Sequence, residues 1–217
     1  MAQASSPAKT SKRCLVQEQE QDHGLLFVIS GPSGVGKDAL LKSMRRRKVD
    51  IHFVVTATTR PPRWNEVNGK DYYFVSVAEF EAMRERGDLL EHAIYSKNHY
   101  GVPKAQVSAA LAAGRDAIMR IDVQGADTLR RRASGIVYIF LCPESPAELR
   151  ARLLRRREAD RNDIDRRMLR AEEEMAEQPR FEYTVVNRTG CLTQAVADVE
   201  AIIRAEKCRT NRRQVVL

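Results

Sequence analysis

A glycine-rich turn between a buried strand and a helix constrains the fold of this chain most. Leu25–Ser30 is an apolar run of strand length, followed by Gly31-Pro32-Ser33-Gly34-Val35-Gly36-Lys37 and then by an expected helix to about Arg47. This spacing is that of a phosphate-binding loop, where backbone N–H groups and a helix N-terminus surround phosphate oxygens and the lysine reaches the outer phosphates. The pattern therefore predicts a pocket for phosphate groups.

The residue after the lysine departs from this pattern. Phosphate-binding loops place Ser or Thr there, and the hydroxyl helps to hold Mg²⁺, whereas this chain has Asp38. A carboxylate can bind Mg²⁺, but it also brings a negative charge close to the phosphates. Alternatively, Asp38 is an acid in the first turn of a helix, which the helix dipole favours by about 0.3–1 kcal/mol.

Strands and helices alternate along the rest of the chain. Strands are expected at Leu25–Ser30, His52–Ala57, Tyr72–Val75, Leu89–Tyr95, Ala117–Ile121, Ile136–Leu141 and Tyr183–Val186, and helices at Val77–Arg86, Lys104–Ala113, Leu149–Arg157, Ile164–Gln178 and Leu192–Glu206. This alternation predicts an α/β fold with a parallel sheet. Residues 55–103 interrupt it with short strands and turns, as an inserted lobe would. Residues 1–22 are expected to be a disordered tail, with an organellar transit segment as the alternative, and residues 209–217 a basic tail.

The net charge of +8 suits polyanionic partners, and its placement narrows the choice. Nine arginines stand against four acids between Arg150 and Arg170, but aromatic residues make up only 6% of the chain and do not alternate with basic ones. This pattern disfavours a stacking surface for nucleic acid and favours small phosphorylated substrates. No apolar run approaches the roughly 18 residues of a membrane span. The four cysteines are far apart and form no metal or redox motif, which is typical of reduced cysteines in the cytoplasm.

Further motifs follow one another between about Gly24 and Lys207. They are Thr58-Thr59-Arg60-x-x-Arg63, Gly69-Lys70-Asp71-Tyr72, Tyr100-Gly101-Val102-Pro103, Asp122-Val123-Gln124-Gly125 and Arg152-Leu153-x-x-Arg156. With these motifs the chain resembles the guanylate kinases, P-loop nucleoside monophosphate kinases that transfer the γ-phosphoryl group of ATP to GMP or dGMP. The resemblance implies dependence on Mg²⁺ and a domain of residues 23–208. Within it we expect a core parallel sheet flanked by helices, a GMP-binding lobe at about 55–103 and a mobile helical lid at about 145–165.

The resemblance also assigns residues to each substrate. ATP would be bound by Gly31, Pro32, Ser33, Gly34, Val35, Gly36, Lys37 and Asp38, with Asn187 beside the adenine. GMP would be bound by Thr56, Arg60, Arg63, Glu66, Tyr72, Glu91, Tyr100 and Asp122. The catalytic residues would be Lys37, Arg60 and Asp122, together with Arg152, Arg156 and Arg167 of the lid and its surroundings. Two arginines and two tyrosines suit a monophosphate dianion, and a carboxylate suits the N1–H and amine of guanine. Asp38 is the candidate Mg²⁺ ligand.

Several positions depart from the family pattern. Thr56 replaces the more usual Ser, Asn65 a turn glycine, Val102 a Ser or Thr that bonds the guanine, and Arg120 an acid two residues before Asp122. With Asp38, these departures are typical of a bacterial and plant-organellar branch. Because an acid has appeared on the loop and a base at the strand end, we expect Arg120 to pair with Asp38.

Two other functions remain open. A catalytically inactive guanylate-kinase-like scaffold that binds phosphopeptides is disfavoured by Lys37, which such modules generally lose. A nucleic-acid-binding protein would need its arginines in one outward stripe. The expected partners are therefore ATP and GMP, with no nucleic acid and no membrane. We expect a monomer or homodimer in the cytoplasm, with an organelle as the less favoured location.

Overall fold

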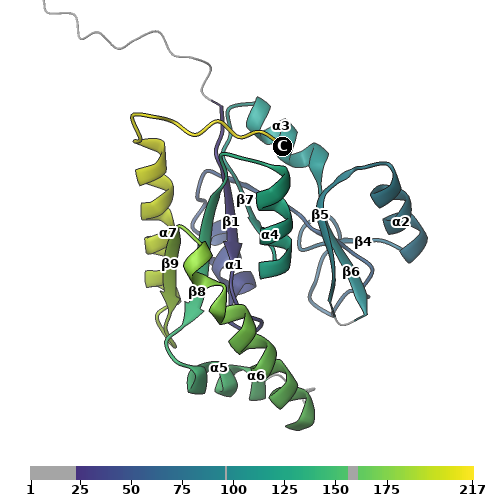
Figure 1. The fold of residues 1–217 in the computed structure, drawn as a ribbon, viewed down its shortest axis with the longest axis vertical. Coiled ribbons are helices and arrows are strands. Elements are labelled where there is room, and N and C mark those ends of the chain that lie inside the picture. Colours follow the sequence, from purple (N-terminus) through teal and green to yellow (C-terminus); the bar gives the residue numbers. More distant parts are fainter. Residues whose placement is uncertain (1–22, 96, 156–160) are drawn as a thin grey trace, which may run out of the picture.

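A parallel sheet of five strands forms the centre of the protein. The structure, a computed structural model, describes residues 23–95, 97–155 and 161–217. The strand order is β2-β7-β1-β8-β9, and all neighbours are parallel. The bounds are β1 Leu26–Ser30, β2 His52–Phe53, β7 Ala117–Arg120, β8 Val137–Pro143 and β9 Tyr183–Asn187. Figure 1 shows this sheet between layers of helices. The predicted α/β fold with a parallel sheet is confirmed.

Each face of the sheet has its own hydrophobic core. Phe27 and Ile29 of β1 pack with α1 (Lys37–Arg46) and α7 (Leu192–Lys207). Leu26 and Val28 face the other way, toward α3 (Lys104–Ala112) and α4 (Val123–Arg132). Because side chains alternate across a strand, a strand covered on both faces is apolar at every position. This explains why β1 reads as a continuous apolar run.

A second, smaller sheet lies beside the first and is built from the segment that interrupts the alternation. Its order is β4-β3-β6-β5, with both parallel and antiparallel pairs. The bounds are β3 Ala57–Thr58, β4 Tyr73–Phe74, β5 Leu89–Tyr95 and β6 Asn98–Pro103, with α2 at Val77–Glu85. Figure 1 shows this unit to one side of the core sheet. Helices α5 (Pro146–Leu154) and α6 (Arg161–Ala176) lie below the core sheet in this view. A short 3₁₀ helix, η1 (Gln178–Arg180), leads into β9.

The structure differs from the predicted elements at several places; strand β6, for example, was not predicted. The single strand expected at His52–Ala57 is two short strands, β2 in the core sheet and β3 in the second sheet, because the chain crosses between sheets there. Helix α4 was not predicted, since its arginines and a glycine hide its apolar positions. Helix α5 begins at Pro146 rather than Leu149, with Ser145 as its N-cap accepting a hydrogen bond from the Glu148 backbone N–H.

The C-terminal residues pack against the body of the protein. Val216 pairs with Ser134 as an antiparallel β-bridge, and Val215 and Leu217 pack on the second core. Arg213 forms ion pairs with the fully buried Glu206 and with Glu182. Within the described part of the chain, no helix has the length and hydropathy to cross a membrane.

Candidate functional site

The glycine-rich loop connects β1 to α1 and wraps around the Lys37 ammonium group. Gly31 adopts φ 135°, and a Cβ there would lie 2.1 Å from the Leu141 carbonyl oxygen, so no other residue fits. The Lys37 ammonium donates hydrogen bonds to the carbonyl oxygens of Gly31 and Pro32. Burial lowers the pKa of Lys37, although the carboxylates of Glu174 and Asp38 oppose this shift. The loop thus holds a buried cation at the N-terminus of a helix.

Two side chains hold this loop from behind. The Arg152 guanidinium and the Asn187 amide both donate to the Val35 carbonyl oxygen, at 2.8 and 2.7 Å. Arg152 also donates to the Asn187 carbonyl at 2.6 Å and pairs with Glu148. Neither Arg152 nor Asn187 lines the cavity described below, so in this structure they position the loop rather than face a ligand.

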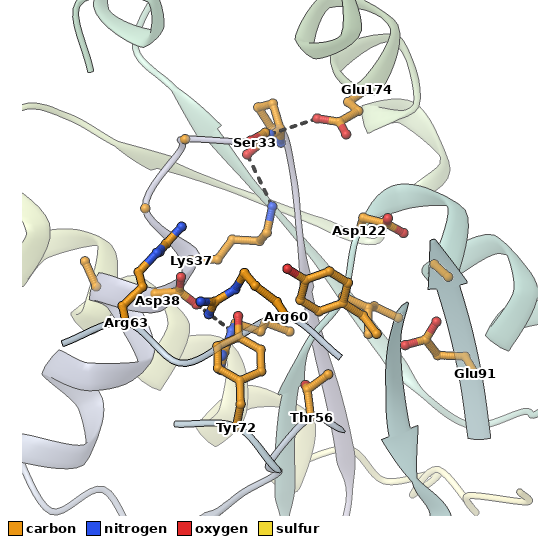
Figure 2. A pocket seen from close by; sticks show the side chains of 18 residues that line it. Ser33, Lys37, Asp38, Thr56, Arg60, Arg63, Tyr72, Glu91, Asp122 and Glu174 are labelled. Carbon is orange, nitrogen blue, oxygen red and sulfur yellow. Dashed lines mark hydrogen bonds and ion pairs between the residues drawn. The ribbon is translucent and has the colours of Figure 1, made fainter. Parts of the chain in front are cut away.

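A carboxylate from α6 accepts a hydrogen bond from the backbone of the loop. Glu174 accepts a hydrogen bond from the Ser33 backbone N–H at 2.8 Å and is only 6% exposed (Figure 2). Burial raises the pKa of Glu174, although the Ser33 N–H and Lys37 favour the charged form. Glu174 is not predicted as a site residue from the sequence, because residues 172–174 resemble the solvated face of a helix.

A cavity of about 360 Å³ lies in front of the loop. This volume is within the range of small-molecule sites. Of the candidate residues, it is lined by Pro32, Ser33, Gly34, Gly36, Lys37, Asp38, Thr56, Arg60, Arg63, Tyr72, Glu91, Tyr100 and Asp122, together with Arg120 and Glu174. The candidates that do not line it are Gly31, Val35, Glu66, Arg152, Arg167 and Asn187. The remaining one, Arg156, lies outside the described residues. The core sheet, the second sheet and α6 all contribute to this one cavity.

A cationic group lies on the side of the second sheet. Arg60 Nη2 donates hydrogen bonds to both carboxylate oxygens of Glu66, at 2.9 and 2.8 Å, and the Arg63 backbone N–H also donates to Glu66. Burial opposes ionisation of Glu66, but these hydrogen bonds outweigh it and lower its pKa. Glu66 therefore orients the two arginines and does not itself line the cavity. Between Arg63 and Glu66, Trp64 is 97% exposed.

Two buried polar atoms at the far end of the cavity have no protein partner among the described residues. They are Thr56 Oγ1 and Glu91 Oε2. Glu91 is only 3% exposed, and burial, with a contribution from the Asp122 carboxylate, raises its pKa to about 8. A buried polar group without a partner costs about 1–3 kcal/mol, so these atoms are placed for a ligand that hydrogen-bonds to them.

Asp122 and Arg120 lie between the two ends of the cavity. Asp122 is the N-cap of α4 and accepts a hydrogen bond from the Gly125 backbone N–H at 2.7 Å. Arg120 ends β7, and its Nε lies 2.5 Å from Asp38 Oδ1. The expected contact between Arg120 and Asp38 is confirmed.

Comparison with known proteins accounts for this geometry. The guanylate kinase family profile matches residues 24–206. The chain belongs to the guanylate kinase family. A guanylate kinase of Nitrobacter winogradskyi is 44% identical over 191 residues, covering 88% of this chain and 86% of that protein. The guanylate kinase 2, chloroplastic/mitochondrial, of Oryza sativa subsp. japonica is 44% identical over 192 residues, covering 88% and 67%. The crystal structure of guanylate kinase from Anaplasma phagocytophilum has a TM-score of 0.72 at 31% identity, covering 88% of this chain and 90% of that one.

One departure from the guanylate kinase pattern has a different meaning in the structure. The sequence places Val102 where many guanylate kinases bond the guanine through a hydroxyl, which predicts a side chain that faces the ligand. Val102 is instead fully buried in the second core and does not line the cavity. A hydroxyl at this position would enter an apolar core, which costs free energy rather than gaining a ligand contact.

The carboxylates of this guanylate kinase suit a Mg²⁺ ion that arrives with a nucleotide. Asp38 and Asp122 both line the cavity, but no group of three metal-binding side chains occurs among the residues that the structure describes. Mg²⁺ usually keeps several waters and binds one or two carboxylates together with substrate phosphates. The residues present fit that mode of binding, with the phosphates as the main ligands.

Proposed function

We propose that this protein transfers the γ-phosphoryl group of ATP to GMP, giving ADP and GDP. One observation carries the proposal: a single cavity has a phosphate-binding loop with Lys37 at one end and, at the other, the buried atoms Thr56 Oγ1 and Glu91 Oε2, which have no partner among the described residues. Family membership supports the same activity. The reaction serves purine nucleotide metabolism by returning GMP to the nucleotide pool.

Each end of the cavity suits one substrate. The loop amides and Lys37 would bind the phosphates of ATP, and Arg60, Arg63, Tyr72 and Tyr100 the phosphate of GMP. The Glu91 carboxylate would accept the N1–H and the exocyclic amine of guanine, and the Thr56 hydroxyl would contact the guanine edge. These contacts supply the partners that the two buried atoms lack.

The chemistry needs alignment and charge neutralisation more than covalent help. An oxygen of the GMP phosphate attacks the γ-phosphorus, a new P–O bond forms, and the bond to the bridging oxygen breaks so that ADP leaves. Lys37 and Arg60 would stabilise the charge that develops on the transferred group. Asp122, an acid between the two substrates, would accept a proton of the base or order a water bound to Mg²⁺. Mg²⁺, bound through the phosphates and reached by Asp38 or Asp122, would neutralise further charge when present.

The lid arginines complete the proposal. Arg156 and Arg167 would contact the phosphates when α5 and α6 close over the cavity, as mobile cations do in this kind of transfer. Arg152, which now holds the loop, would act through the position of Val35.

A coupled assay of ADP formation tests the function. We expect turnover with ATP and GMP together, and little with AMP, CMP or UMP in place of GMP. Absence of turnover with GMP would instead favour the phosphopeptide-binding scaffold. The predicted cytoplasmic location is a separate proposal, tested by imaging the tagged protein in its own cells.

A further inference from the structure

The ion pair between Asp38 and Arg120 connects the phosphate loop to the core sheet. Asp38 is the second residue of α1, and its side chain is 53% exposed; Arg120 is the last residue of β7, and its side chain is 11% exposed. The distance of 2.5 Å from Nε to Oδ1 is a direct charge-assisted hydrogen bond. The more buried partner is therefore the arginine, whose orientation the pair fixes.

The rest of the Arg120 guanidinium contacts the GMP side of the cavity. Its Nη2 donates to the Asp71 carbonyl oxygen at 3.2 Å, and its Cζ lies 4.6 Å from the centre of the Tyr72 ring. A planar guanidinium can make these contacts and the ion pair at once, which an ammonium group cannot. Arg120 thus joins α1 and β7 to the segment that carries Tyr72.

Two residues of α1, on the same helix face as Asp38, contact residues 70–72 directly. Lys42 Nζ lies 3.2 Å from Asp71 Oδ1, and Arg45 Nη1 donates to the Lys70 carbonyl oxygen at 3.0 Å. Asp38, Lys42 and Arg45 are four and three residues apart, so they share one helix face. The helix that begins at the phosphate loop is therefore docked on residues 70–72.

The charges of the pair also suit its place. A lone carboxylate beside the loop would repel the phosphates, and a lone buried guanidinium would lack a counter-charge. Together they are neutral, and they leave Tyr72 with one face against a fixed guanidinium. Arg60 lies over the same ring, with Cζ 5.5 Å from its centre.

We propose that Arg120, held by Asp38, is a positioning residue for the GMP phosphate that acts through Tyr72. The inference rests on the proposed function, because it takes Tyr72 as a contact of that phosphate. Arg120 touches neither substrate in this role. It sets the place of the tyrosine that does, and ties that place to the helix of the phosphate loop.

A double-mutant cycle with D38N and R120Q tests the pairing, since both changes remove a charge without adding a new one. The readouts are KM for GMP, KM for ATP, kcat, and the Kd of GMP alone by calorimetry. We expect R120Q to raise KM and Kd for GMP by about 10-fold and KM for ATP by less than about threefold. We expect D38N to raise the Kd of GMP as well, and the double variant to bind GMP no more weakly than R120Q, with coupling of about 2- to 150-fold in this Kd for residues in contact.

A second cycle tests the route through Tyr72. In a Y72L background, R120Q should change GMP binding by less than about twofold, because the residue it positions is gone. R120K retains the charge but not the planar contacts, so it should recover only part of the loss. R120K also carries the test should R120Q fail to fold, which thermal unfolding reports.

The matched control is R47A, which breaks the ion pair of 3.4 Å between Arg47 and Glu200 at the other end of α1. It should leave both KM values unchanged. Additive losses in the first cycle, equal rises in the two KM values, or an undiminished effect of R120Q in the Y72L background would each overturn the inference. Failure of the wild-type protein to turn over GMP would refute the proposed function instead, and the calorimetric Kd values would still decide whether Arg120 positions the phosphate site.

Discussion

The two ends of the cavity differ in how their polar groups are satisfied. At the loop end, the Ser33 N–H, the Val35 carbonyl and the Lys37 ammonium all have partners within the protein. At the far end, Thr56 Oγ1 and Glu91 Oε2 have none among the described residues. The loop end is therefore preorganised for phosphates, which every nucleotide carries. The two unpartnered atoms cost free energy, which the base of the proposed substrate would offset, so we expect selectivity to reside at the far end.

The largest effect is expected from breaking the loop end at its charge. Lys37→Met keeps an unbranched side chain that is one atom shorter, and removes the cation that the loop encloses. We expect kcat/KM to fall by about 10²–10³-fold, the loss for one group that stabilises transition-state charge. The coupled assay measures this, and thermal unfolding separates it from misfolding. Activity within tenfold of wild type would remove Lys37 from the catalytic set.

The most direct test of the far end is a change of the Glu91 carboxylate. Glu91→Gln retains an oxygen acceptor but loses the charge, and a hydrogen bond to a charged group contributes about 1.5–3 kcal/mol, so kcat/KM for GMP should fall by about 10- to 150-fold. AMP, which lacks the N1–H and the amine of guanine, should be affected much less. If both nucleotides lost activity equally, Glu91 would not select the base.

The raised pKa of Glu91 predicts that GMP binding depends on pH. The carboxyl group is neutral below its pKa of about 8. In the proposed complex, only the carboxylate would accept both guanine protons. GMP affinity should therefore fall as pH falls through 8, and be about 25-fold weaker at pH 6.5 than at pH 8.5. Calorimetry over this range measures it. The GMP phosphate also titrates, so E91Q is the control, and it should lose most of the dependence.

The loop end is also tested by removing its front contact. Glu174→Ala removes the hydrogen bond from the Ser33 N–H to the Glu174 carboxylate, so the free energy of unfolding should drop by about 1–3 kcal/mol. Glu174→Gln keeps an acceptor and should lose less than half of that. Urea unfolding of the two variants measures the difference. Equal losses would mean that the charge of Glu174, and not its hydrogen bond, holds the loop.

The smallest effect is expected at the second unpartnered atom. Thr56→Val removes a buried hydroxyl that has no partner among the described residues, so the free energy of unfolding should rise by about 1 kcal/mol. KM for GMP should rise by about 2- to 10-fold, the contribution of one neutral hydrogen bond. Opposite signs in the two measurements distinguish a group kept for a ligand from one kept for the fold. A loss of stability would contradict that role.

The sequence predicted what local chemistry specifies. The glycine spacing gave the loop between β1 and α1, and the two unlike charges gave the contact between Asp38 and Arg120. The chain crossing at Val54–Thr56 was missed, because an unbroken β-branched run carries no mark of leaving one sheet for another. The burial of Val102 was missed for a related reason, since it depends on how the second sheet packs against the rest of the protein.

Contacts over long separations were beyond the sequence. Ser33 and Glu174 are 141 residues apart, and Val35 and Asn187 are 152 apart. Helix α4 could have been found, since Asp122 is a good N-cap and Val123, Ala126 and Leu129 share a face. The support of the loop by Arg152 could not, because nothing local distinguishes that arginine from its neighbours.

The exposed Trp64 gives the protein an optical reporter. It is the single tryptophan of the chain, and it lies in sequence between Arg63 and Glu66, which form an ion pair. Indole fluorescence excited selectively therefore comes from this loop alone, with no label and no engineered residue. Any rearrangement of the arginines around a bound monophosphate can be followed in real time by stopped flow, separately from events at the other end of the cavity.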